Sequence, residues 1–179
     1  MKPARITVLV VLLILGTGML HAAGTPAGTV ITNFATGEFK DFLGNPLPSI
    51  TSNTVQIVVA QVAGVDINPP TGSLNILGNA PVYYSIQLTN TGNGADSFTL
   101  AALTSGTETD DYVLEIYHDV DGNGIVDGTD AIITSSGTLP ADASMDLILK
   151  VADTTSTPTD GDVTVSTLTA VSVYDGSVT

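Results

Sequence analysis

Residues 81–102 read PVYYSIQLTNTGNGADSFTLAA, and this stretch decides the fold. Apolar side chains occupy every second position from Val82 to Leu88, and Phe98 and Leu100 repeat the spacing after segment 90–94. A period of two predicts strands that turn one face toward a core, and clustered Asn and Gly residues predict a tight reversal. The stretch therefore predicts two antiparallel strands joined by a short turn.

The same alternation recurs along the chain after residue 23. Further strands are predicted at 112–117, 145–151 and 163–174, and upstream at 28–39, at 53–62 and from 64 to 68. Within 163–174 the apolar phase slips near Ser166 and Thr167, which predicts a β-bulge. We find no helical period in any long window of this region. The predicted fold class is all-β: an immunoglobulin-like antiparallel β-sandwich with an N-terminal strand arm.

Three segments resemble a known family. Residues 84–100 read YSIQLTNTGNGADSFTL, and 27–33 and 51–55 read AGTVITN and TSNTV. They are similar to the conserved-repeat Ig-like domains of bacterial and archaeal cell-surface proteins and to the strands that lead into them. The resemblance covers nearly all of the chain after residue 23, although only one copy and no wall-anchor motif are visible. It implies an Ig-like sandwich that serves as a spacer, an adhesive module or an assembly unit.

The first 23 residues are predicted to be a signal peptide. Lys2 and Arg5 precede an apolar run at 6–20, and small residues follow it. This order is typical of secretion signals, and the run is shorter than the roughly 20 residues that a spanning helix needs. Cleavage between Ala22 and Thr25 and an extracellular or cell-surface location are expected; a retained membrane anchor is the alternative. The remaining chain divides into an arm at 24–62 and a sandwich at 63–179.

Charge and composition exclude several classes of protein. The chain has 18 acidic and 4 basic residues, and removal of the signal leaves Lys40 and Lys150 as the only Lys or Arg residues, for a net charge of −16. Nucleic-acid binding needs clustered Lys and Arg, so it is not expected. No membrane partner is expected after signal cleavage. A disulfide framework is excluded because the chain has no cysteine.

We find no catalytic constellation, and the chain is predicted not to be an enzyme. His118 is the only histidine after the signal, and nucleophilic catalysis needs a base beside its nucleophile. A polar strand end is the simpler interpretation of His118. A glycosidase carboxylate pair is not supported either, because the chain has no Trp and only 5% aromatic residues to line a sugar cleft.

Residues 119–130, DVDGNGIVDGTD, carry the pattern of a calcium loop. Oxygen ligands fall at loop positions 1, 3, 5, 7, 9 and 12, with glycine at position 6. The predicted Ca²⁺ ligands are Asp119, Asp121, Asn123, the Ile125 carbonyl, Asp127 and Asp130. Asp130 stands where such loops usually have Glu, and strands instead of helices flank the segment, so it resembles an EF-hand loop inserted in a β-hairpin. The alternative is a bare Asp/Asn/Gly turn.

Two classes of function remain. The first is a structural subunit of an extracellular filament or surface assembly, a homopolymer stabilised by Ca²⁺ and built by strand exchange. The exchanging strand would contain Val30, Ile31, Thr32 and Phe34, with Val30, Thr32 and Phe34 on one side and Ile31 on the other. Alternatively, this segment folds back on residues 53–62. The second class is a surface-associated adhesive module that binds a glycan or a protein without self-assembly.

Overall fold

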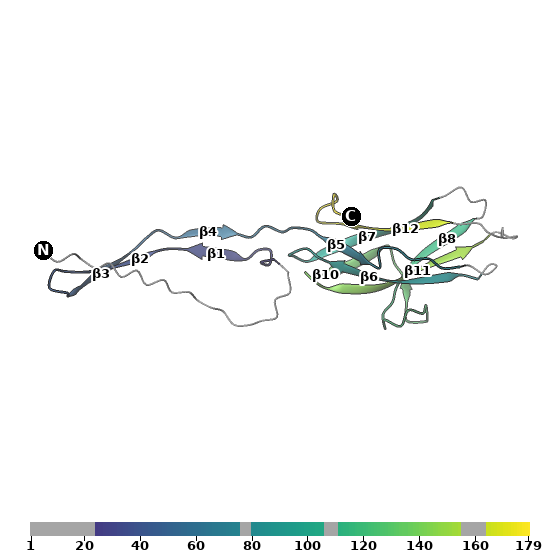
Figure 1. The fold of residues 1–179 in the computed structure, drawn as a ribbon, viewed down its shortest axis with the longest axis horizontal. Coiled ribbons are helices and arrows are strands. Elements are labelled where there is room, and N and C mark those ends of the chain that lie inside the picture. The colour runs from purple at the N-terminus through teal and green to yellow at the C-terminus, as the bar shows by residue number, and fades with distance from the viewer. Residues whose placement is uncertain (1–23, 76–79, 106–110, 155–163) are drawn as a thin grey trace.

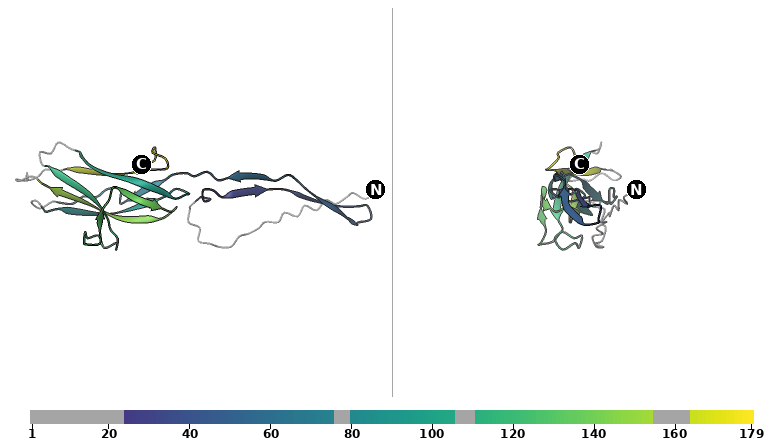
Figure 2. Two further views of the ribbon diagram at one scale, coloured as in Figure 1. Left: turned by 180° about the vertical axis from the view of Figure 1, so that it is seen from behind. Right: turned by 90° about the vertical axis from the view of Figure 1, so that its left-hand side faces the viewer.

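The computed structural model describes residues 24–75, 80–105, 111–154 and 164–179, so the predicted signal peptide lies outside it. These residues form twelve strands and no helix, which confirms the all-β prediction. The molecule has two parts, a sandwich of two sheets and a long two-stranded extension that we call the ribbon, residues 24–62 (Figure 1). Seen end-on, the ribbon falls within the outline of the sandwich, so the two parts share one long axis (Figure 2).

The sandwich consists of a five-stranded and a three-stranded sheet. The five-stranded sheet has the order β5-β6-β11-β8-β9, and the three-stranded sheet has the order β10-β7-β12, with antiparallel pairs throughout. The strands are β5 (Val65–Asn68), β6 (Val82–Asn90), β7 (Asp96–Ser105), β8 (Tyr112–His118), β9 (Ala131–Ile132), β10 (Ser135–Leu139), β11 (Ser144–Asp153) and β12 (Val165–Ser172).

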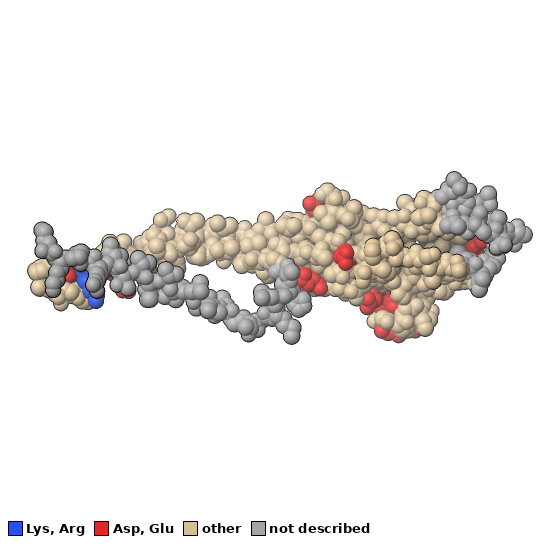
Figure 3. Space-filling view, viewed as in Figure 1, with Lys and Arg blue, Asp and Glu red and all other residues tan. Residues whose placement is uncertain are grey.

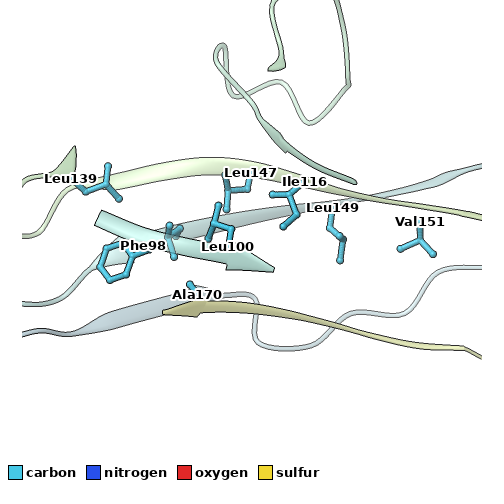
Figure 4. Close-up of a cluster of buried hydrophobic side chains, with 9 residues drawn as sticks. Phe98, Leu100, Ile116, Leu139, Leu147, Leu149, Val151 and Ala170 are labelled. Atoms are coloured by element: carbon cyan, nitrogen blue, oxygen red, sulfur yellow. The ribbon is translucent and has the colours of Figure 1, made fainter. Parts of the chain in front are cut away.

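The core lies between the two sheets (Figure 4). Its buried side chains are Leu88, Phe98, Leu100, Ile116, Leu139, Leu147, Leu149, Val151 and Ala170. Most of them occupy the alternating positions that the sequence predicts to face inward. Each large apolar side chain buried in this way contributes about 1.5–3 kcal/mol, so this cluster is the main source of stability.

The ribbon contains four short strands. β1 (Val30–Asn33) pairs with β4 (Val55–Val58), and β2 (Thr36–Lys40) pairs with β3 (Pro46–Thr51). The predicted strand at 28–39 is therefore two strands. The first, β1, pairs with the segment at 53–62 as in the fold-back alternative, and the second, β2, pairs with β3, which was not predicted. The ribbon pairs with itself and not with either sheet of the sandwich.

A well-formed turn closes the far end of the ribbon. The Asp41 carboxylate accepts hydrogen bonds from the N–H groups of Leu43 (2.9 Å) and Asn45 (2.8 Å) and from the Asn45 side chain (2.9 Å). These bonds, that of the Asn45 side chain above all, lower the pKa of Asp41. Gly44 takes the positive φ of 89° that the reversal needs. Phe42 stands at the tip with 95% of its surface exposed.

Turn 91–95 between β6 and β7 fixes the base of the ribbon to the sandwich. The Asn93 side chain donates to the carbonyl oxygens of Thr25 (3.1 Å) and Ala60 (3.0 Å) and accepts from the Val62 N–H (2.7 Å). A Cβ on Gly92 would lie 2.6 Å from the Val62 carbonyl oxygen, so only glycine permits this approach. The prediction that β6 and β7 pair across this turn is wrong, because the two strands lie in different sheets and the turn connects the sheets. The same turn also anchors the ribbon.

The prediction of a β-bulge in the last strand is wrong. β12 pairs with β7 over eight consecutive residues without a register shift, so the bulge predicted near Ser166 and Thr167 is absent from this ladder. Val165 and Val173 face outward, with 56% and 65% of their surfaces exposed, and the inward positions are filled by side chains such as Leu168 and Ala170. Strands β3, β9 and β10 were not predicted from the sequence.

Candidate metal centre and exposed ribbon

Loop 119–130 begins where β8 ends and leads into β9, and it projects from the side of the sandwich (Figure 1). Its first residue, Asp119, is 5% exposed, and the Asp119 N–H donates to the Asp146 carbonyl oxygen at 3.0 Å. Gly124, at loop position 6, has a φ of 73°, and a Cβ there would lie 2.7 Å from the Ser85 hydroxyl oxygen. The loop is therefore held against β6 and β11 at a position that only glycine fits.

Three carboxylates converge in this loop. One oxygen each of Asp119, Asp121 and Asp130 lies within 4.8 Å of the other two, so the three residues could hold a metal ion. Three like charges this close repel one another, and the cost is larger for the buried Asp119. A cation among them removes that cost, because carboxylate oxygens are the ligands that hard divalent ions prefer.

Backbone N–H groups donate to all three of these carboxylates, and Asp121 accepts from the Asn123 N–H at 3.2 Å. Asp119 accepts hydrogen bonds from the N–H groups of Asn123 (3.2 Å) and Gly124 (2.8 Å). Asp130 accepts from the N–H groups of Val120 (3.1 Å) and Asp127 (2.9 Å). These hydrogen bonds hold the carboxylate oxygens in fixed positions.

Asp127 does not join the triad, whereas the Asn123 side chain lies against it, because its amide nitrogen donates to an Asp121 oxygen at 2.7 Å. The Asn123 side-chain oxygen accepts from the Ile125 N–H at 2.6 Å. One Asp127 oxygen accepts from the backbone N–H and the hydroxyl of Thr129, both at 2.7 Å, and these bonds lower the pKa of Asp127. The structure thus brings together loop positions 1, 3 and 12, and leaves the side chains at positions 5 and 9 bonded within the loop.

The predicted assembly strand lies on an apolar, exposed ribbon. Large apolar side chains that are about half exposed or more run along its length: Val30, Ile31, Phe34, Phe39, Phe42, Leu43, Leu47, Ile50, Val55, Ile57, Val58 and Val62. Direct cross-strand partners share a face, so Val30 and Val58 lie on one face and Ile31 and Ile57 on the other. Both faces are therefore apolar, and an isolated two-stranded hairpin is marginally stable in water.

A shallow groove of about 370 Å³ marks the junction between the two halves of the ribbon. It is lined by Ile31, Asn33, Phe34, Ala35, Ser52, Asn53, Val55 and Ile57. Ile31 and Phe34 therefore both contribute apolar surface to this groove. Residues 34 and 35 fall between β1 and β2, where the strand alternation is interrupted.

An ion pair joins the adjacent strands β8 and β11. Lys150 Nζ lies 2.7 Å from Glu115 Oε2, and the Tyr117 hydroxyl donates to the same oxygen at 3.0 Å. The hydrogen bond from Lys150, followed by that from Tyr117, lowers the pKa of Glu115, and the bond to Glu115 raises the pKa of Lys150. His118 ends β8 beside the acidic loop, and it is not part of the carboxylate triad.

Sequence reasoning missed one functional position, the anchoring side chain Asn93. The signal was present in the Asn-x-Gly pattern of segment 90–94, which we interpreted only as a turn. No family model, curated protein or solved structure matches the chain. Among the described residues, no helix has the length and apolar character needed to cross a bilayer.

Proposed function

We propose that the mature chain is a secreted structural subunit of an extracellular filament or surface assembly. Copies polymerise by strand exchange through the ribbon, and Ca²⁺ in loop 119–130 stabilises each subunit. The observation that carries the proposal is the ribbon itself: two apolar faces and two unpaired strand edges, held in line with the sandwich (Figure 1).

The ribbon suits assembly because it has little to stabilise it alone. A free strand edge offers unpaired N–H and C=O groups, and pairing with a sheet edge of another copy satisfies them. The ribbon of each copy would dock on a different surface of the next copy. Such a contact is heterologous, so it continues as a filament instead of closing as a dimer.

Charge distribution also favours the ribbon as the contact surface. The sandwich, residues 63–179, has 16 carboxylates and one lysine, whereas the ribbon has two carboxylates and one lysine. Acidic atoms in the space-filling view gather on the sandwich and its projecting loop (Figure 3). Two sandwiches repel each other, but a nearly neutral ribbon approaches a sandwich with little electrostatic cost.

Ca²⁺ is the metal that best fits loop 119–130. The ion takes six to eight oxygen ligands, and the loop sequence offers them at calcium-loop spacing around the Asp119, Asp121 and Asp130 carboxylates. Extracellular calcium at millimolar concentration occupies even a weak site of this kind. Because the ion binds the folded loop, it stabilises the sandwich by mass action and offsets part of its negative charge.

Electron microscopy and sedimentation of the mature protein, with calcium and with chelator, test this function. We expect filaments from the intact chain and a folded monomer after deletion of residues 25–60. Val30→Ser with Val58→Ser should also prevent polymerisation, whereas the matched control Val113→Ser, at an exposed valine of β8, should not. A mature protein that stays monomeric at high concentration in calcium contradicts the proposal and favours the adhesive module.

A further inference from the structure

The sandwich has four outer strands: β5, β9, β10 and β12. Three of them have features that protect an edge strand from pairing with another chain. β5 has four residues, includes Asp66 and is followed by two prolines. β9 has two residues and follows the acidic loop. β10 contains Gly137, has a register shift against β7 and is followed by Pro140. Charge, proline, shortness and bulges are the devices by which proteins keep sheet edges from pairing.

β12 has none of these devices over residues 165–171, and only its last outward N–H group, that of Ser172, is covered, by the Val178 carbonyl oxygen at 3.0 Å. Its eight residues read VSTLTAVS, with no charge, glycine or proline, and its register against β7 is regular. The Leu100 N–H donates toward β10, to the Thr134 carbonyl oxygen at 2.9 Å, so the even-numbered residues of β7 face that side. In the antiparallel ladder, the N–H groups of Ser166, Leu168 and Ala170 then point away from β7. Among the described strands, none pairs with this side of β12.

Some apolar side chains of β6 and β12 that pack against the core are only partly buried. A three-stranded sheet packs on a five-stranded one, so part of the larger sheet has no strand opposite it. Val82, Tyr84 and Ile86 of β6 and Leu168 of β12 are only partly buried against the core cluster. Two additional strands beside β12 would give the smaller sheet five strands as well.

The ribbon provides two uncharged strands with the required direction. β7 begins next to turn 91–95, where the ribbon is anchored, so the antiparallel β12 ends at that same end of the sandwich. β4 runs from the ribbon tip toward the sandwich. When copies repeat along their common long axis, β4 of one copy therefore runs antiparallel to β12 of its neighbour. Antiparallel pairing is slightly more stable per residue than parallel pairing.

We infer that β4 of one copy pairs antiparallel with the free edge of β12 of a second copy, which extends the smaller sheet to the order β10-β7-β12-β4-β1. This inference rests on the proposed function and specifies its acceptor surface. Charge is compatible, because β1, β4 and β12 contain no charged residue while the rest of the sandwich is strongly acidic.

Cysteine cross-linking tests the pairing directly, because the native chain has no cysteine. Gln56→Cys or Ile57→Cys, which face opposite sides of the ribbon, is mixed with a second protein carrying Thr167→Cys or Thr169→Cys on β12. We expect intermolecular cross-links with a short bis-maleimide in calcium, and none when the second protein carries the matched control Thr138→Cys on β10. Polymers whose ribbon cysteines cross-link to Thr138→Cys, or to neither strand, overturn the inference.

An edge-blocking pair of variants gives an independent test. Thr167→Lys places a charge on β12, and Thr138→Lys places the same charge on β10, the other outer strand of that sheet. Both threonines are exposed, so thermal unfolding of the monomers in chelator should match the unmodified chain. We expect Thr167→Lys to raise the critical concentration for polymerisation at least about tenfold, and Thr138→Lys to leave it unchanged.

The outcomes separate the two proposals. If the unmodified mature chain forms no polymer, both the proposed function and the acceptor edge are wrong. If polymers form but Thr167→Lys polymerises as readily as the unmodified chain, assembly stands and the assignment of β12 is overturned.

Discussion

The ribbon and the sandwich contain similar strands, but large apolar side chains are exposed in the ribbon and buried in the sandwich. Phe98 on β7 is completely buried, whereas Phe34 and Phe39 in the ribbon are 59% and 50% exposed. Both regions are made of antiparallel pairs with apolar residues near every second position. The alternation thus predicts a strand and its faces, but only long-range packing decides whether another sheet covers them. In the ribbon, no second sheet of the described residues covers them.

Truncating one phenylalanine in each region should show the largest difference. Phe98→Ala leaves a cavity in a closed core and should lower the free energy of unfolding of the monomer by about 3–5 kcal/mol. Phe34→Ala should lower it by less than about 0.5 kcal/mol, because the side chain is already exposed. Denaturant unfolding in chelator measures both values. Equal losses in the two variants would mean that the ribbon packs in solution as the sandwich does.

Calcium should stabilise the sandwich and leave the ribbon unchanged. At a concentration about 100 times the dissociation constant, the ion should add about 2.7 kcal/mol to the free energy of unfolding. Asp121→Ala should remove this gain and have little effect in chelator. Asp66→Ala, which removes an exposed carboxylate outside the loop, is the matched control. Thermal unfolding with and without calcium gives the comparison, and no shift in the unmodified chain would contradict the metal assignment.

Loss of the hydrogen bonds that anchor the base of the ribbon should lower the local stability of the ribbon and leave that of the sandwich unchanged. Asn93→Ala removes three hydrogen bonds to residues 25, 60 and 62 and should cost about 1–2 kcal/mol of local stability. Hydrogen exchange should become faster at Val62 and along the ribbon while core amides keep their protection. Asn33→Ala, a ribbon substitution away from the anchor, should not change exchange at the base. Faster exchange throughout the core would mean that the anchor supports the whole fold.

The smallest effect is expected at the Glu115–Lys150 ion pair on the sandwich surface. Because the folded pKa of Glu115 lies below its unfolded value, the pair stabilises the protein above the unfolded pKa. That contribution is lost as pH falls through the folded pKa. Glu115→Gln should therefore cost about 0.5 kcal/mol near neutral pH and nothing in strong acid. Denaturant unfolding across this range checks the trend, and a constant difference at all pH values would contradict it.

The sequence predicted the sandwich core better than the ribbon. The inward rows of β6, β8 and β11 follow directly from alternation, since each strand is long and pairs on both sides. Strand β10, SSGTL, shows no alternation and forms because it lies beside β7. The bulge in β12 was predicted from valines that face outward, so apolar character was mistaken for burial.

The candidate metal site was predictable in its spacing but not in its geometry. The pattern at 119–130 identifies the loop and three carboxylates that do converge. The spacing cannot show that the Asp127 carboxylate accepts a hydrogen bond from Thr129. Local hydrogen bonds of this kind compete with metal binding at every Asp of a turn. The ribbon was harder, since β3 contains two prolines and the pairing of β1 with β4 spans more than 20 residues.

The alignment of the ribbon with the sandwich has a mechanical consequence (Figure 2). In a filament of such subunits, a pull along the axis acts parallel to β1, β4 and β12. The hydrogen bonds of those ladders then carry the load together, in shear, and none can open without its neighbours. A sideways pull would instead break them one after another. Asn93 lies where the load passes from the ribbon to the sandwich, so the fibre should resist tension far better than it resists peeling.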